Sequence, residues 1–436
     1  MQFKSTRART GGVSFRSAVL QCLPEDGGLY IPVEVSDVRQ LFLYMDDQIS
    51  YPDLVSTVTP ALLGSELNPV VADTVAKEAY SFEPALVPLD EHVSLLELHN
   101  GPTGVFKDFG ISYCASIIEQ LVDQEGRAVT LTATTGQAGS SIARAFAGKR
   151  NTLAVLLYPE GPIHGLKPET FVENGGNILP LQVKGSFDDC QMLIQAAFKD
   201  RALIDRYSLT SANTINIGRL LPQSFYYLYS FIMLKKQVHG DLLFSVPSGN
   251  FGNLIAGLYA WKFGMPVNGF IAAMNANNSF GPFFKGQSFV PGEAIRTLSS
   301  SMDVGKPTNY ERMASFYAES PSVMRNMVIP RTISDTETRE AIIEVYEKFG
   351  RLIDPHTAVA YAAARQVLKN DLEDGHVVVL STGHPARKAK ELEDILGITV
   401  DIPEQLAAYQ QVSAPVATIP VQLEALETLI AGACPS

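Results

Sequence analysis

One lysine in this sequence is placed where it could do covalent chemistry. Lys107 lies in the run from Asn100 to Gly110, between Phe106 and Phe109. Apolar neighbours disfavour an ammonium ion and lower its pKa, which makes the amine a better nucleophile. Apolar residues follow at helical spacing, so we expect Lys107 at or just before a helix start. Most single lysines are solvated surface residues, so this motif needs support from elsewhere in the chain.

A glycine-rich loop offers a place for an anion. The loop Ser248-Gly249-Asn250-Phe251-Gly252-Asn253 follows the apolar run 242–246 and precedes a helical pattern through Leu258. Glycine lets the backbone approach a ligand closely, and the N–H groups at a helix start point toward an anion. The loop is neither a dinucleotide fingerprint nor a P-loop. It predicts a phosphate site of another kind.

Two further strand–loop–helix patterns carry similar loops. Residues 128–133 read as a strand, 134–139 as a loop and 140–147 as a helix, while the strand candidate 377–380 leads into the loop 381–385. The alternation of short apolar runs with helical patterns indicates an α/β fold. Loops at the carboxyl ends of parallel strands meet in a crevice where ligands bind. Each loop taken singly is also explained as a turn with a helix cap.

Length and charge narrow the class of protein. A chain of 436 residues with 46% apolar residues predicts two or three globular domains with a large core. The net charge of −12 and the lack of a basic cluster argue against nucleic acid as a partner. The chain has no apolar run long enough for a membrane span, and its first residues lack the pattern of a signal peptide. Four scattered cysteines predict a reduced, cytoplasmic protein without a metal site.

Taken together, these segments resemble the threonine synthase family, of the longer type, within the pyridoxal-phosphate enzymes of fold type II. The resemblance runs over most of the chain in order. It rests on the following segments: 12–15 with 27–32, 101–103 with 106–110, 211–216 with Arg219 and Gln223, 246–252, 302–305 with Asn309 and Glu311-Arg312, 354–360, and Thr382 with His384-Pro385-Ala386.

The resemblance implies an architecture and a reaction. It implies two open α/β domains with the active site in the crevice between them, divided as an N-terminal mixed unit 1–95, a smaller domain 96–215 with the lysine, and a larger domain 216–436. The implied reaction is a lyase reaction that converts O-phosphohomoserine and water to threonine and phosphate by γ-elimination and β-addition. The implied partner is a small phosphorylated amino acid, bound by a monomer or homodimer.

The resemblance also implies roles for individual residues. Lys107 would carry pyridoxal 5'-phosphate as a Schiff base and move protons during the reaction. The remaining cofactor contacts would come from Ser248, Gly249, Asn250, Phe251, Gly252, Asn253, Thr382 and Gln137. The substrate would be bound by Thr134, Thr135, Gly136, Asn213, Thr214 and Arg219.

Four residues depart from the family pattern. Asn100 stands where the family has His, Gln137 and Ala138 replace an acid or amide and a Thr, and Gly383 replaces an Ala. These changes leave open an enzyme of the same fold with another amino-acid substrate or nucleophile. A non-catalytic regulatory relative is a further alternative, and Lys107 argues against it. Outside these motifs, His356 is expected to take part in a helix cap, and Asp188-Asp189 to begin a helix.

Overall fold

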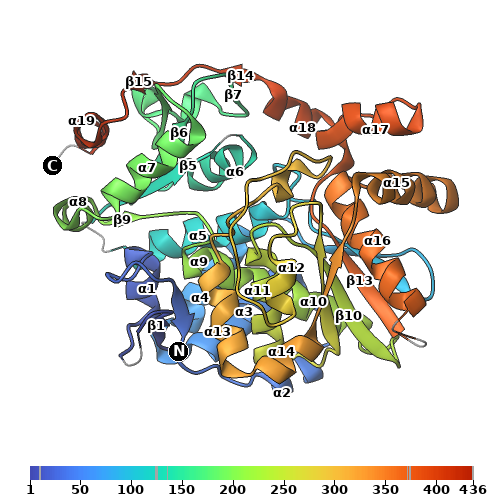
Figure 1. The fold of residues 1–436 in the computed structure, drawn as a ribbon. Coiled ribbons are helices and arrows are strands. Elements are labelled where there is room, and N and C mark those ends of the chain that lie inside the picture. The colour runs from blue at the N-terminus through green and yellow to red at the C-terminus, as the bar shows by residue number, and fades with distance from the viewer. Residues whose placement is uncertain (9–10, 123–125, 135, 371, 373–374, 435–436) are drawn as a thin grey trace.

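The chain folds around two β-sheets that are both covered by helices. A computed structural model describes residues 1–8, 11–122, 126–134, 136–370, 372 and 375–434. One sheet lies in the upper part of Figure 1 and the other in the lower part. The predicted α/β architecture is therefore confirmed.

The larger sheet has six strands in the order β12-β11-β10-β13-β4-β3. All neighbours are parallel except β3, which pairs with β4 in the antiparallel sense. The bounds are β3 Ala85–Pro88, β4 Val93–Glu97, β10 Asp241–Pro247, β11 Gly269–Met274, β12 Val328–Thr332 and β13 Gly375–Ser381.

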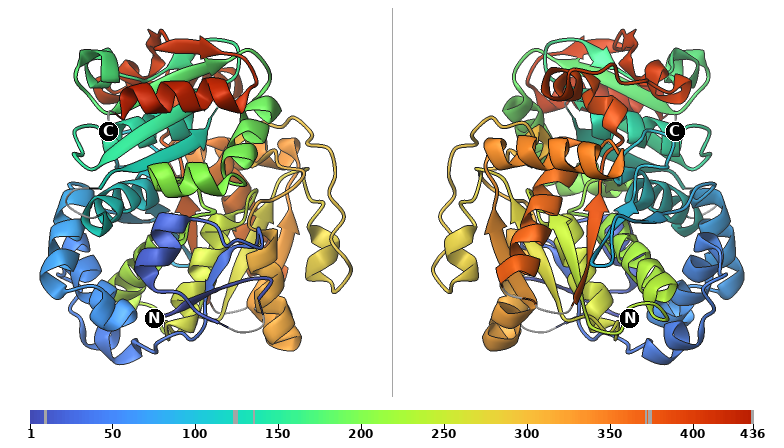
Figure 2. Two further views of the ribbon diagram at one scale, coloured as in Figure 1. Left: turned by 90° about the vertical axis from the view of Figure 1, so that its left-hand side faces the viewer. Right: turned by 90° about the vertical axis from the view of Figure 1, so that its right-hand side faces the viewer.

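Helices cover both faces of this larger sheet. Successive side chains of a strand point to opposite sides, so each central strand contributes to two cores. In β10, Phe244 and Val246 pack into the core with helices α10 (Ser224–Leu234) and α11 (Gly252–Lys262). Leu243 packs on the other face, in a core formed with α15 (Asp335–Phe349) and α16 (Pro355–Asn370). Figure 2 shows α15 and α16, in orange, along one side of the sheet.

The smaller sheet is wholly parallel, in the order β15-β8-β6-β5-β9. Its strands are β5 Ala128–Ala133, β6 Thr152–Tyr158, β8 Ile178–Val183, β9 Leu209–Thr210 and β15 Ala417–Ile419. One face packs against α7 (Phe187–Ala197), α8 (Arg201–Tyr207) and α19 (Leu423–Ala433). The other face packs against α5 (Lys107–Leu121) and α6 (Gln137–Phe146).

The N-terminal part packs against the same core as α10 and α11. It begins with the antiparallel pair β1 (Phe3–Ser5) and β2 (Tyr30–Pro32), and its helices are α1 Phe15–Gln21, α2 Arg39–Tyr44, α3 Tyr51–Leu63 and α4 Pro69–Ala79. The pair β7 (Ile163–His164) and β14 (Val412–Ser413) is a separate antiparallel ribbon. The remaining α-helices are α9 Ile217–Leu220, α12 Gly281–Phe284, α13 Tyr310–Glu319, α14 Pro321–Met327, α17 Ala389–Leu396 and α18 Glu404–Ala407.

The two sheets do not follow the predicted division of the chain at two points. Strands β3 and β4 join the larger sheet, whereas β15 and α19 return to the smaller one. Neighbouring strands of a parallel sheet can be far apart in the sequence. A division of the chain into consecutive ranges therefore does not predict every strand of each sheet. Within the described ranges, none of the helices has both the length and the apolar character that crossing a bilayer requires.

Candidate functional site

The start of α5 lies against the end of β13. Phe106 N–H donates to the carbonyl of Thr382 over 2.9 Å, and His384 N–H donates to the carbonyl of Gly104 over 2.9 Å. Lys107 is the first residue of α5, as the sequence predicted. These bonds bring Lys107 close to Thr382, so the lysine segment meets one of the three predicted loops, 381–385.

Lys107 is a half-buried residue whose amine is flanked by cations. Burial and the nearby Arg219 and Arg387 guanidiniums lower the pKa of Lys107 to about 8, and Asp108 only partly opposes them. The Asp108 carboxylate is already engaged, because it accepts from Thr103 N at 2.8 Å and Thr103 Oγ1 at 2.6 Å. An amine in such surroundings is deprotonated near neutral pH more often than an ordinary lysine, so it can act as nucleophile and base.

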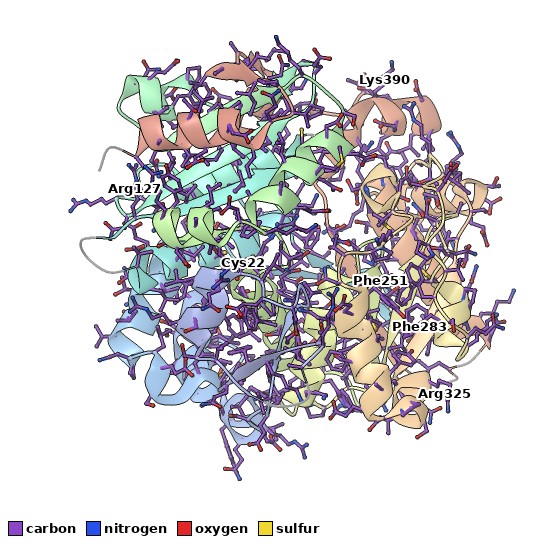
Figure 3. The ribbon with its side chains drawn as sticks, turned by 60° about the vertical axis from the view of Figure 1, so that its left-hand side comes forward. Cys22, Arg127, Phe251, Phe283, Arg325 and Lys390 are labelled. Carbon is purple, nitrogen blue, oxygen red and sulfur yellow. The ribbon has the colours of Figure 1, made fainter. Side chains whose placement is uncertain are left out.

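The loop between β10 and α11 has the shape of an anion site. Phe251 adopts a left-handed conformation, with φ of 59°, immediately before the first residue of α11. The first N–H groups of a helix have no carbonyl partner within it and attract negative charge. A Cβ on Gly249 would lie 2.7 Å from the Cα of Met302, so only glycine fits. Figure 3 labels Phe251, which is buried, whereas the labelled Lys390 lies at the outer edge.

The polar side chains of this loop are largely occupied within the protein. Ser248 donates its hydroxyl to the carbonyl of Val246 over 2.8 Å. Asn250 Nδ2 donates to Thr308 Oγ1 over 2.8 Å, and Thr308 N–H donates back to Asn250 Oδ1 over 2.6 Å. The side chains of Ser248 and Asn250 therefore shape the loop. The Ser248 N–H donates to the carbonyl of Ala273 over 2.8 Å, so the backbone N–H groups from Gly249 onward are the donors left for a ligand.

Asn253 faces helix α10. Its Oδ1 accepts from the hydroxyls of Tyr226 at 2.6 Å and Tyr227 at 2.8 Å, while its Nδ2 is buried without a partner among the described residues. Burial raises the pKa of both phenols, so they stay protonated and donate. This pair of bonds fixes the first turn of α11 to α10.

The predicted substrate-phosphate segment adjoins the anion loop. Thr214 N–H donates to Asn213 Oδ1 over 2.7 Å, and Thr214 Oγ1 accepts from Asn309 Nδ2 at 3.0 Å. A Cβ on Gly252 would lie only 3.2 Å from Thr214 Cγ2. The segment around Thr214 and the start of α11 are thus in contact.

Arg219 joins this group from helix α9. Its Nη1 donates to the carbonyl of Ala212 over 2.6 Å, and burial lowers the pKa of its guanidinium to about 10. A Cβ on Gly110 would lie 2.7 Å from the carbonyl oxygen of Arg219, so α5 and α9 pack with backbones almost touching. Arg219 thereby lies beside Lys107 with no carboxylate of its own within the described part.

The loop after β5 is organised locally. Thr134 is buried, and its Oγ1 accepts from Gly136 N at 3.2 Å and Gly139 N at 3.0 Å. Thr135 lies outside the described residues, and Gln137 begins α6. The hydroxyls of Ser141 and Thr103 are 2.7 Å apart, which ties α6 to the loop before Lys107.

Arg387 is a site residue that the sequence predictions missed. It lies in the short 3-10 helix η6 (Pro385–Lys388), and its Nη1 donates to the carbonyl of Thr103 over 2.7 Å. No local sequence pattern marks this residue, because its place in the site follows from a contact between segments 284 residues apart.

The remaining predictions concern helix caps, and they are confirmed. His356 lies at the start of α16, with its Nδ1 bonded to Asp354, which also accepts from Thr357 N at 3.0 Å. The other predicted helix start is α7, which has a reciprocal cap between Ser186 and Asp189.

Two of the departures from the family pattern have a physical account. A Cβ on Gly383 would lie 2.9 Å from Asp354 Oδ2, so the glycine relieves crowding there. The ring of His99 is half-buried and packs edge-to-face against His384, with the centroids 5.2 Å apart, whereas Asn100 is exposed. Within the described ranges, no cluster of three His, Cys, Asp or Glu residues could bind a metal ion.

Three family models together match most of the chain. A model of pyridoxal-phosphate dependent enzymes matches residues 89–383, a threonine synthase N-terminus model matches 2–80, and a threonine synthase C-terminal model matches 357–430.

Threonine synthases from several organisms are similar to this chain over nearly its whole length. Threonine synthase of Haemophilus influenzae is 36% identical, covering 92% of both chains, and that of Escherichia coli is 35% identical, covering 96% of both. The crystal structure of the Escherichia coli enzyme superimposes with a TM-score of 0.86, covering 99% of this chain and 100% of the other. A structure of threonine synthase from Brucella melitensis with bound pyridoxal phosphate is 27% identical, with a TM-score of 0.87 and complete coverage of both chains.

Proposed function

Because the chain belongs to the threonine synthase family of pyridoxal-phosphate-dependent enzymes, we propose that it converts O-phosphohomoserine and water to threonine and inorganic phosphate. The observation that carries this proposal is the desolvated Lys107 amine, which has a lowered pKa and lies beside Thr382, Arg219 and Arg387. Such an amine suits both attachment of an aldehyde and proton transfer.

The residues of the site fit the cofactor. Lys107 has a lowered pKa and no hydrogen bond within the described part, so its Nζ is available to hold the aldehyde carbon. The N–H groups at the start of α11 would hold the cofactor phosphate, with Gly249 allowing the close approach. Thr382 would meet the pyridine nitrogen. When bound, the cofactor supplies an electron sink that stabilises negative charge at the substrate carbons.

Lys107 Nζ would move the protons of the reaction. Its pKa of about 8 lies near neutral pH, where an amine can both accept a proton at Cα and return one. Thr134 and Gly136 would hold the substrate carboxylate before the start of α6, whereas Thr135 and the Gln137 side chain lie outside what the structure describes. The half-buried position of Lys107 would limit the access of bulk water to these protons.

The substrate's phosphate would be bound on the Thr214 side of the site. Arg219 has one Nη bonded to Ala212 and no carboxylate partner among the described residues, so its charge is available to an anion. Asn213 and Thr214 directly follow Ala212, the hydrogen-bond partner of Arg219, and would bind the same anion. A guanidinium with adjacent amide and hydroxyl donors suits phosphate oxygens.

Substitution of Arg219 tests the phosphorylated substrate. Arg219→Ala removes a charge-assisted contact worth roughly 1.5–3 kcal/mol, so kcat/KM for O-phosphohomoserine should fall by about 10- to 150-fold. The measurement is release of phosphate together with detection of threonine, with the visible absorbance and thermal midpoint checking the cofactor and the fold. Unchanged kinetics in a variant that keeps its cofactor would show that the substrate phosphate binds elsewhere.

A second candidate is an enzyme of this fold with a different amino-acid substrate or nucleophile. Ala138 in α6 favours it, because alanine lacks the hydroxyl that the family has at that position. A panel of O-phosphohomoserine, O-phosphoserine and O-acetylhomoserine separates the two candidates. A preference for either of the last two would overturn the first proposal.

The assembly and compartment belong to the same proposal. Three of the four cysteines are buried and all four are free, which supports a reduced, cytoplasmic protein. We expect a monomer or homodimer, which sedimentation of the purified protein would distinguish.

A further inference from the structure

A buried asparagine lies where the anion loop and the substrate segment touch. Asn309 is fully buried and immediately precedes helix α13. Its Nδ2 donates to Thr214 Oγ1 over 3.0 Å and to the carbonyl of Asn250 over 3.2 Å. Thr214 and Asn250 belong to chain segments 36 residues apart, so one amide group holds both. Neither sequence predictions nor the proposed mechanism gives this residue a role.

The orientation of this amide is set by Arg312. Arg312 Nη1 donates to Asn309 Oδ1 over 2.8 Å, which leaves Nδ2 as the group that faces Thr214 and Asn250. Arg312 is itself fixed, because it is fully buried and donates to three backbone carbonyls: those of Tyr30 at 3.0 Å, Thr214 at 2.6 Å and Ile215 at 2.7 Å. A reversed amide would place Oδ1 against another carbonyl oxygen, which is unfavourable.

The bond from Asn309 to Thr214 Oγ1 limits the directions in which the Thr214 hydroxyl can donate its proton. A hydroxyl has one proton, so an oxygen that accepts from Asn309 can direct that proton elsewhere. The alternative acceptor within the protein, Asn213 Oδ1, is 3.4 Å away and already accepts from Thr214 N–H. An anion beside Thr214 is a much stronger acceptor than such a distant amide oxygen.

The bond from Asn309 to the carbonyl of Asn250 orients the peptide group between Asn250 and Phe251. A trans peptide points its C=O and N–H in opposite directions. Because the Asn250 carbonyl points at Asn309, the N–H of Phe251 in the same peptide points away from Asn309. Phe251 immediately precedes α11, where the N–H groups are the donors left for a ligand.

We propose that Asn309 is a positioning residue that turns two donors, the Thr214 hydroxyl and the Phe251 N–H, toward the anions of the site. It contacts neither substrate nor cofactor and acts only through the groups it holds. The substrate part of this inference rests on the proposed function, in which Thr214 binds the substrate phosphate.

A double-mutant cycle in the holoenzyme tests the substrate part. Asn309→Leu removes both bonds at similar volume without adding charge. The inhibition constant of inorganic phosphate and the KM for O-phosphohomoserine should both rise about 5- to 20-fold, with kcat changed much less. Thr214→Val should have a similar effect. Adding Asn309→Leu to Thr214→Val should then change either constant by less than about 2-fold, since the hydroxyl to be oriented is already gone.

A matched control variant separates the loss of oriented donors in the site from a loss of protein stability. Asn177 is also buried, and its Nδ2 donates to the carbonyls of Phe146, Lys149 and Thr152, outside the proposed site. Asn177→Leu should lower the thermal midpoint at least as much as Asn309→Leu and leave the phosphate constant unchanged. The cofactor dissociation constant, measured by visible absorbance, should rise for Asn309→Leu alone.

The outcomes are distinguishable. If Asn309→Leu matches Asn177→Leu in both binding constants, Asn309 is structural and the inference is wrong. If Thr214→Val changes the phosphate constant but Asn309→Leu does not, the inference fails while the proposed substrate site stands. If Thr214→Val has no effect on KM, both the substrate role of Thr214 and the inference that rests on it are overturned.

Discussion

Two glycine-containing loops at strand ends have opposite kinds of support. The loop after β10 is braced from outside, because Asn250 exchanges hydrogen bonds with Thr308 and its carbonyl accepts from Asn309, both almost 60 residues away. The loop after β5 is held by Thr134, whose Oγ1 accepts from Gly136 and Gly139 only a few residues on. A braced loop suits a ligand that stays bound, and a self-contained loop suits one that enters and leaves in each turnover.

The largest effect is expected from replacing Lys107, the residue that would carry the cofactor held by the loop after β10 and act on the substrate held by the loop after β5. Lys107→Ala should lower kcat by about 10²- to 10⁴-fold, because the variant lacks the amine that moves protons. The cofactor-phosphate contacts after β10 remain, so the variant should still bind pyridoxal phosphate, with an altered visible spectrum. Stopped-flow absorbance and steady-state kinetics measure both properties, and near-normal turnover would contradict the role of Lys107.

The next effect in size is expected from steric crowding of the loop after β10. Gly249→Ala places a methyl group 2.7 Å from the Met302 backbone, which cannot move aside as a side-chain tip can. Overpacking of this kind costs about 1–3 kcal/mol, so the cofactor should bind about 5- to 150-fold more weakly. Gly281→Ala is the control, since no atom lies within 4 Å of the added methyl. Equal cofactor affinities in the two variants would argue against a rigid loop.

The pH dependence of cofactor capture tests the charge around Lys107. The amine attacks an aldehyde only when deprotonated, so the capture rate of the apoenzyme should rise with pH and level off above about 8, not above 10.5. Arg387→Gln removes a neighbouring cation, which should raise the pKa of Lys107 and slow capture at pH 7 by up to about tenfold. A profile that still rises at pH 10 in the unmodified protein would show an ordinary, solvated lysine.

The smallest effect is expected in the self-contained loop. The double substitution Gln137→Asn with Ala138→Thr restores the family pattern after β5. If neighbouring hydroxyls such as Thr134 already serve the substrate, kcat/KM for O-phosphohomoserine should change by less than about 2-fold. A rise of about 5-fold or more, equivalent to one further hydrogen bond, would instead favour the enzyme with altered substrate handling.

The local sequence determined where several strands and helices lie and that Lys107 stands at a helix start. The strand predicted at 128–133 is β5 with the same bounds, and those at 242–246 and 377–380 are the cores of β10 and β13. Lys107 begins α5, and the loop at 248–253 ends at a helix start. These features depend on apolar periodicity and on short-range backbone preferences, which a single segment already contains.

Which groups face the site depends on contacts between distant segments of the folded chain. The tertiary structure engaged the side chains of Ser248 and Asn250 within the protein, turned Asn253 toward Tyr226 and Tyr227, and brought Arg387 to Thr103. The direction of a hydrogen bond depends on partners that are distant in sequence, as Asn309 and Thr214 illustrate. The sequence therefore specified the chemistry available to this protein, whereas the packing of distant segments set the pKa of Lys107 and the orientation of its neighbours, because burial and charge are properties of the assembled core.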